Sequence, residues 1–190
     1  MIKLHDLNNY LNKFSWGCVT YNNGFNITDG NNIDDWIQYK ILSPKKFILA
    51  HCGCCWDYTN FEYYFFKKYY SDINIKCYYI EYNNGATHTW LSYFKNNKVY
   101  TFESSLKQHT GITEFQYEEE SLLYYKQIVI PTVKDYVIYE YIPIINVNAL
   151  EFMAYIFKTG KLIKNIGDYY NKYIKHVIES NYKDFNSYEW

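Results

Sequence analysis

The chain has 190 residues, of which 22% are aromatic, and a formal net charge of −1 at pH 7. This length is typical of one domain, 1–190, with a sizeable buried core. Its 19 basic residues form no basic run, and no apolar segment approaches the roughly 20 residues that span a bilayer. We therefore expect a cytoplasmic protein without nucleic acid or membrane as a partner.

The first 50 residues predict short helices separated by turns. Residues 5–14 carry apolar side chains at helical spacing: Leu4, Leu7, Leu11 and Phe14. Glycine and asparagine punctuate 15–30, which predicts a loop with a brief hairpin. Asp34 and Asp35 suit the start of a second short helix, and Ser43-Pro44 either ends it or opens the next turn.

The middle of the chain predicts a long helix followed by an antiparallel meander. Apolar and aromatic residues recur at helical spacing over 55–70. Strands are then expected over 73–82, 87–94 and 98–103, with Asn96-Asn97 as a hairpin tip. This order indicates an α+β fold.

The C-terminal part, 118–190, predicts further helices and one strand. A helix is expected over 118–126 and a strand over 136–142, and the capping pair Asn148 and Glu151 opens another helix. A last helix is predicted from an apolar stripe made by Leu162, Ile163, Ile166, Tyr169, Tyr170, Tyr173, Ile174, Val177 and Ile178. We expect this stripe to dock on the core; a homo-oligomer or partner surface is the alternative.

Three of the five cysteines crowd into H-C-G-C-C at 51–55, directly before the long helix. A disulfide within so short a stretch would be strained, so we expect reduced thiols. The start of a helix lowers the pKa of a thiol through its unpaired N–H groups and its dipole, which makes a nucleophile. Spacing alone does not decide between Cys54 and Cys55.

The hairpin predicts a partner for this thiol. If Asn96-Asn97 is a two-residue tip, Lys95 faces Lys98 and the register places His88 and Glu103 diagonally on one face. A carboxylate there can orient the imidazole and set its tautomer. A three-residue tip would put the two side chains on opposite faces.

Simpler interpretations compete with a catalytic triad. Cysteine is often inert core, a strand histidine can be structural, and a carboxylate at a strand end can be merely solvated. Zinc could bind H-C-G-C-C with Cys77 and His88 as distant ligands. Structural zinc sites usually present two paired knuckles, and there is no second pair here. We therefore expect neither metal nor cofactor.

The motifs G-x-C-W-D, T-H-T-W and F-E-S-S, followed by G-I-T-E-F, lie in this order between about residues 43 and 115. This pattern resembles the transglutaminase-like branch of the papain-like cysteine enzymes. The resemblance implies an α+β fold in which the nucleophile opens a helix packed on an antiparallel sheet or small barrel. The C-terminal strand and helices would be additions to that core.

The resemblance also assigns roles to residues. It places the nucleophile at Cys55, the base at His88 and the orienting acid at Glu103, where many members of the family have Asp. The backbone N–H of Cys55 would contribute to the oxyanion hole, and Trp16 is a candidate for its second donor.

A cysteine-dependent acyl-transfer enzyme is the function these roles imply. Hydrolysis of a protein or peptide substrate, as a peptidase, amidase or deamidase, is the expected outcome. Protein cross-linking by a true transglutaminase and a binding module without turnover are the alternatives.

Overall fold

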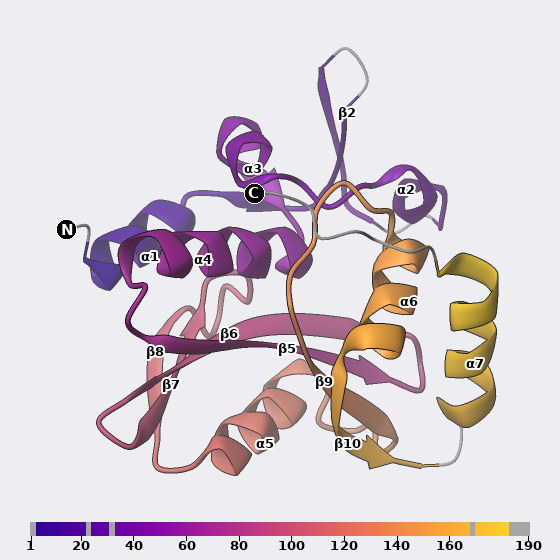
Figure 1. Cartoon of the computed structure of the whole chain (residues 1–190). Helices are drawn as coiled ribbons and strands as arrows, with labels where there is room; N and C mark the ends of the chain where they lie inside the picture. The colour runs from indigo at the N-terminus through magenta and orange to yellow at the C-terminus, as the bar shows by residue number, and fades with distance from the viewer. Residues whose placement is uncertain (1–2, 22–23, 31–32, 168–169, 183–190) are drawn as a thin grey trace.

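The computed structural model describes residues 3–21, 24–30, 33–167 and 170–182 (Figure 1). Its centre is a six-stranded sheet with the order β10-β9-β5-β6-β7-β8, in which every neighbouring pair is antiparallel. The strands are β5 (Asn74–Tyr82), β6 (Thr87–Lys95), β7 (Lys98–Glu103), β8 (Gly111–Phe115), β9 (Tyr136–Tyr141) and β10 (Lys161–Ile166). With helices on both faces, this arrangement confirms the α+β class.

Helices cover the two faces of the sheet, with α4 on one face and α5 on the other (Figure 1). The described helices are α1 (Leu4–Leu11), α2 (Ile33–Gln38), α3 (Pro44–Ala50), α4 (Cys55–Tyr69), α5 (Glu118–Val129), α6 (Ala149–Thr159) and α7 (Tyr170–Asn181). Successive residues of a strand point to opposite faces. On β5, Tyr79 therefore joins the larger core under α4 and α6, whereas Tyr78 joins a smaller core with Trp90 and Tyr125.

The N-terminal part forms two small sheets beside the main one. β2 (Cys18–Tyr21) and β3 (Phe25–Thr28) make the expected hairpin, and β1 (Ser15–Trp16) pairs in parallel with β4 (Cys52–Gly53). Ser43-Pro44 opens a separate helix, α3, because the Ser43 hydroxyl accepts a hydrogen bond from Lys46 N–H at 3.4 Å. Pro44 occupies the first turn, where its missing N–H costs nothing.

The β6–β7 hairpin has the predicted two-residue tip. Lys95 pairs with Lys98 and Leu91 with Phe102, so the expected register is confirmed. Asn96 and Asn97 take positive φ angles of 52° and 60°, which is the geometry of the tight turn that best fits the twist of two strands. β8, which was not predicted, extends the sheet beyond β7.

The prediction of one long C-terminal helix is wrong for its first part. Residues 161–166 form β10, which pairs with the edge of β9, and Gly167 follows with a φ of 100° that favours glycine. Helix α7 starts only at Tyr170. Its apolar side does dock on the larger core, where Val177 is buried and Ile174 and Ile178 are partly buried.

No helix in the described ranges combines the length and the apolar character that crossing a membrane requires.

Candidate active site

Helix α4 begins at Cys55, with Cys54 as its N-cap residue. The fully buried carboxylate of Asp57 accepts hydrogen bonds from Cys54 N–H at 3.0 Å and from Leu42 N–H at 2.8 Å. The first N–H groups of a helix have no acceptor within the helix, so the N–H of Cys55 stays available to an external oxygen. The helix start is thereby held in place with an unused donor beside the thiol.

Close packing around Gly53 explains why the G-x-C-W-D motif begins with glycine. A Cβ atom at this position would lie 2.7 Å from Asp57 Cβ and 2.8 Å from Phe47 Cε2. Such distances are shorter than van der Waals contact, so a side chain here would displace Asp57 or Phe47. Glycine allows the strand to approach the helix start that closely.

Trp16, the candidate second donor to an oxyanion, reaches this region through a strand pair. Trp16 pairs with Gly53 in the β1–β4 ladder, and Trp16 and Cys55 line the same cleft. The Trp16 side chain is 44% exposed. Its proposed contribution to an oxyanion hole stays a prediction.

His88 and Glu103 meet as the hairpin register predicts. His88 Nε2 lies 3.0 Å from Glu103 Oε2, and both residues are buried. The other carboxylate oxygen of Glu103 accepts from Ser105 N–H at 2.7 Å, from the Ser105 hydroxyl at 2.8 Å and from Leu106 N–H at 2.9 Å. Ser105 of the F-E-S-S motif and the following Leu106 therefore supply the hydrogen bonds that hold the Glu103 carboxylate in place.

Cys55 joins this pair where the β6–β7 ladder stops. β6 pairs with β7 only from Leu91 onward, so His88 and Thr89 lie beyond the paired region. There the His88 side chain and Thr89 N–H lie close enough to the Cys55 thiol to lower its pKa. Because Nε2 faces Glu103, Nδ1 is the nitrogen left for the sulfur. The structure thus brings Cys55, His88 and Glu103 together.

Two aromatic rings pack beside the His88 imidazole. His88 stacks near Tyr125, with ring centroids 5.7 Å apart, and near Trp90, with centroids 6.3 Å apart. Trp90 and Tyr125 themselves stack at 4.2 Å. Such packing restricts the rotation of the ring and keeps it aligned between the thiol and the carboxylate.

Cys55, His88 and Glu103 shift one another's pKa values toward the charged forms. The Cys54 thiol, the His88 imidazolium and Thr89 N–H hold the pKa of the Cys55 thiol well below its ordinary value of 9.0, although burial opposes this. Burial lowers the pKa of His88, but the Glu103 carboxylate and the Cys55 thiolate overcome that effect and raise it to about 10. Burial likewise raises the pKa of Glu103, and His88 brings it below its ordinary value. The directions of these shifts favour a thiolate, an imidazolium and a carboxylate over the neutral forms of the three groups.

The other four cysteines have the opposite character. Burial raises the pKa of Cys18 to about 12, and it raises the pKa of Cys52, Cys54 and Cys77 as well. The Cys54 thiol is hydrogen-bonded to the Tyr39 hydroxyl at 3.2 Å. Protonated, buried thiols fit packing roles, so Cys55 is the one cysteine of the chain that is poised as a nucleophile.

One face of α4 contacts the sheet and the segment after β7 through polar side chains near Cys55. These contacts were not predicted from the sequence. Cys55, Thr59 and Glu62 share that face because they are four and then three residues apart. Thr59 Oγ1 lies 3.1 Å from Thr89 Oγ1, and buried Glu62 accepts a hydrogen bond from the Ser104 hydroxyl. Helical periodicity counted from Cys55 could have pointed to both residues.

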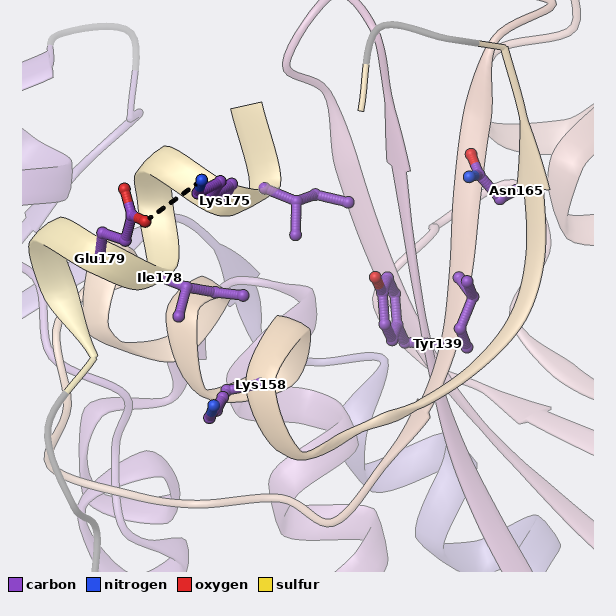
Figure 2. A pocket seen from close by; sticks show the side chains of 8 residues that line it. Tyr139, Lys158, Asn165, Lys175, Ile178 and Glu179 are labelled. Carbon is purple, nitrogen blue, oxygen red and sulfur yellow. Dashed lines mark ion pairs between the residues drawn. The ribbon is translucent and has the colours of Figure 1, made fainter. Parts of the chain in front are cut away.

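A second hollow lies between α6, α7, β9 and β10 and has a volume of about 430 Å³ (Figure 2). Its polar lining includes Lys158, Asn165, Lys175 and Glu179. Lys175 and Glu179 pair with each other at 3.8 Å. The described lining contains neither cysteine nor histidine.

Within residues 3–21, 24–30, 33–167 and 170–182, no group of three or more His, Cys, Asp or Glu side chains is placed to hold a metal ion.

Comparisons with family models, curated proteins and solved structures found no match to this chain. The transglutaminase-like assignment therefore rests on the residues and their geometry.

Proposed function

We propose that this protein is a cysteine-dependent acyl-transfer enzyme of transglutaminase-like type, acting as a hydrolase on a protein or peptide substrate. The observation that carries the proposal is the convergence of Cys55, His88 and Glu103 at the start of a helix, where His88 lies 3.0 Å from Glu103 and lowers the pKa of the Cys55 thiol. A nucleophile, its base and an orienting group in contact are the signature of covalent catalysis. Free cysteines at all five positions suit a reducing compartment such as the cytoplasm.

In the first half-reaction the Cys55 thiolate attacks the carbonyl carbon of an amide or ester. The developing oxyanion accepts a hydrogen bond from Cys55 N–H, with Trp16 as the candidate second donor. As the tetrahedral intermediate collapses, the His88 imidazolium gives its proton to the departing amine or alcohol. A thioester on Cys55 and a neutral imidazole remain.

In the second half-reaction neutral His88 takes a proton from water, and the resulting hydroxide attacks the thioester. Collapse of this intermediate releases the acid and restores the thiolate and imidazolium. Glu103 stays ionised and holds the ring in one tautomer throughout. We favour water over an amine acceptor because hydrolysis is the broader default for the fold that the chain resembles and nothing in the sequence favours an amine site.

An electrophilic peptide probe, followed by mapping of the modified residue by mass spectrometry, tests the nucleophile. We expect labelling of Cys55 in the wild type, none in Cys55→Ala, and retained labelling in the control Cys77→Ala, which removes a buried cysteine of β5. An unlabelled wild type, or equal labelling of Cys55→Ala, would favour a binding module without turnover. A peptide library incubated with the protein then separates the outcomes: new termini or deamidated glutamines indicate hydrolysis, whereas isopeptide bonds indicate cross-linking.

A further inference from the structure

Cys55 lines a cleft of about 530 Å³. The roles of Cys55, His88 and Glu103 do not say what this cleft binds. Five parts of the chain build it: the β1 strand, helix α2, the start of α4, the turn before β6 and the start of α6. This volume lies within the range of about 300–1,000 Å³ that is typical of sites for small molecules or substrate side chains. Its described lining comprises Trp16, Trp36, Ile37, Cys55, Trp56, Gly85, Ala86, Thr87, Asn148, Ala149, Leu150 and Met153.

This lining is apolar and carries no formal charge apart from the thiolate. Three indole rings, those of Trp16, Trp36 and Trp56, contribute to it. Trp36 and Trp56 lie 5.4 Å apart between ring centroids, and Trp56 also packs on Phe152 of α6 at 4.9 Å. Rings that are packed against each other form a wall whose shape is set before a ligand arrives.

The polar groups of the lining are few and partly in use. Asn148 Oδ1 already accepts from Glu151 N–H at 2.9 Å as the cap of α6. Apart from Cys55 and the three indole N–H groups, of which that of Trp36 donates to Gly30 O at 2.8 Å, the Thr87 hydroxyl is the other uncharged polar side-chain group of the described lining. A charged substrate group placed here would lose water without gaining an ionic partner, and such a transfer is costly.

We propose that this cleft binds the acyl portion of the substrate and selects an uncharged, apolar or aromatic side chain next to the reacting carbonyl. The acyl portion is bonded to Cys55 through the thioester, so it occupies the space beside the sulfur in both half-reactions. The proposal rests on the proposed function for the chemistry but adds a substrate class to it.

Matched acyloxymethyl ketone probes test the selection on wild-type protein. The probes differ only in the side chain next to the ketone: phenylalanine, aspartate or lysine. We expect the phenylalanine probe to label Cys55 faster than either charged probe by roughly 100-fold. Equal rates for the three probes would overturn the cleft assignment while leaving the nucleophile intact.

A charge placed at the rim provides the second arm, with a closely matched control. Leu150 on α6 lines the cleft and is 43% exposed, whereas Leu123 on α5 is 42% exposed and lies outside it. Leu150→Lys should raise the ratio of aspartate to phenylalanine labelling by about three- to fivefold, the size of a surface charge interaction. Leu123→Lys should leave this ratio unchanged. The cleft assignment fails if both variants shift it equally.

Binding to Cys55→Ala separates the cleft from the chemistry. N-acetylphenylalanine amide should change the intrinsic tryptophan fluorescence of this variant saturably, because three of the five tryptophans line the cleft. N-acetylaspartate amide should not. Saturable binding of the first amide with no probe labelling of wild type would support the cleft and refute the proposed function. Absence of binding by both amides would refute the cleft.

Discussion

The cleft beside Cys55 and the hollow beside α7 differ in what lies beneath them. Under the cleft beside Cys55, ionisable groups are buried and joined by hydrogen bonds, as in the 3.0 Å contact between His88 and Glu103. In the hollow beside α7, the paired side chains of Lys175 and Glu179 are 75% and 63% exposed (Figure 2). A hollow by itself therefore does not indicate a reactive site. Buried ionisable groups that converge on a hollow indicate one more strongly.

The physical reason is the screening of charge. Interactions between groups inside a protein are strong because the surroundings polarise little, and each group must have a partner. Exposed charges are screened by water and salt, and their pairs contribute little. Substitutions in the two regions should accordingly differ greatly in effect.

The largest expected effect comes from Glu103→Gln. Glutamine retains the shape but places an NH₂ group against either His88 or the N–H donors of Ser105 and Leu106, so the imidazole loses its fixed tautomer. We expect probe labelling or turnover to fall by roughly 100-fold or more. Single-turnover labelling of Cys55 measures this loss.

Glu114→Gln is the control for this change, because Glu114 pairs with Lys98 on the exposed side of β8. Its rate should match the wild type. If Glu103→Gln reacted as fast as Glu114→Gln, the carboxylate would have no role in orienting His88.

Asp57→Asn should have the next largest effect, on stability. The carboxylate accepts from two backbone N–H groups, and asparagine offers one oxygen and one NH₂ group, so one buried donor is left unpaired. The free energy of unfolding should fall by about 1–3 kcal/mol in urea denaturation. Asp72→Asn, at an exposed position, should change it by less than about 0.5 kcal/mol. An equally small loss in Asp57→Asn would show that Asp57 does not hold the helix start.

The smallest effect is expected in the second hollow. Lys175→Met removes an exposed ion pair and should change the free energy of unfolding by less than about 0.5 kcal/mol, with labelling of Cys55 unaltered. Thermal unfolding and the probe assay check both. A clear loss of labelling in this variant would mean that the region beside α7 contributes to the site after all.

The hairpin was predictable because local rules determine it. A two-residue asparagine tip and the alternation of side chains set the register of β6 and β7 without knowledge of any distant residue. The segment 161–166 was not predictable in the same way. Leu162, Ile163 and Ile166 fit helical spacing, and only pairing with the edge of β9 makes them a strand.

The same distinction separates the residues of the site. His88 and Glu103 follow from a strand and a hairpin register, whereas the helix start left Cys54 and Cys55 open and the family resemblance chose Cys55. The buried carboxylates of Asp57 and Glu62 depend on Leu42 and Ser104, which are distant in the sequence. Sequence patterns indicate a carboxylate but not the donor that makes its burial tolerable.

The pH dependence of Cys55 alkylation by iodoacetamide, mapped by mass spectrometry, tests the central claim most directly. A pKa held well below 9.0 favours the thiolate of Cys55, and a pKa raised to about 10 favours a protonated His88 through neutrality. The rate of Cys55 alkylation should therefore change less than about twofold between roughly pH 6 and pH 8, whereas the alkylation rate of an ordinary thiol rises nearly 100-fold. His88→Asn should restore the steep rise. A steep rise in the wild type would contradict the thiolate and imidazolium pair on which the proposed function depends.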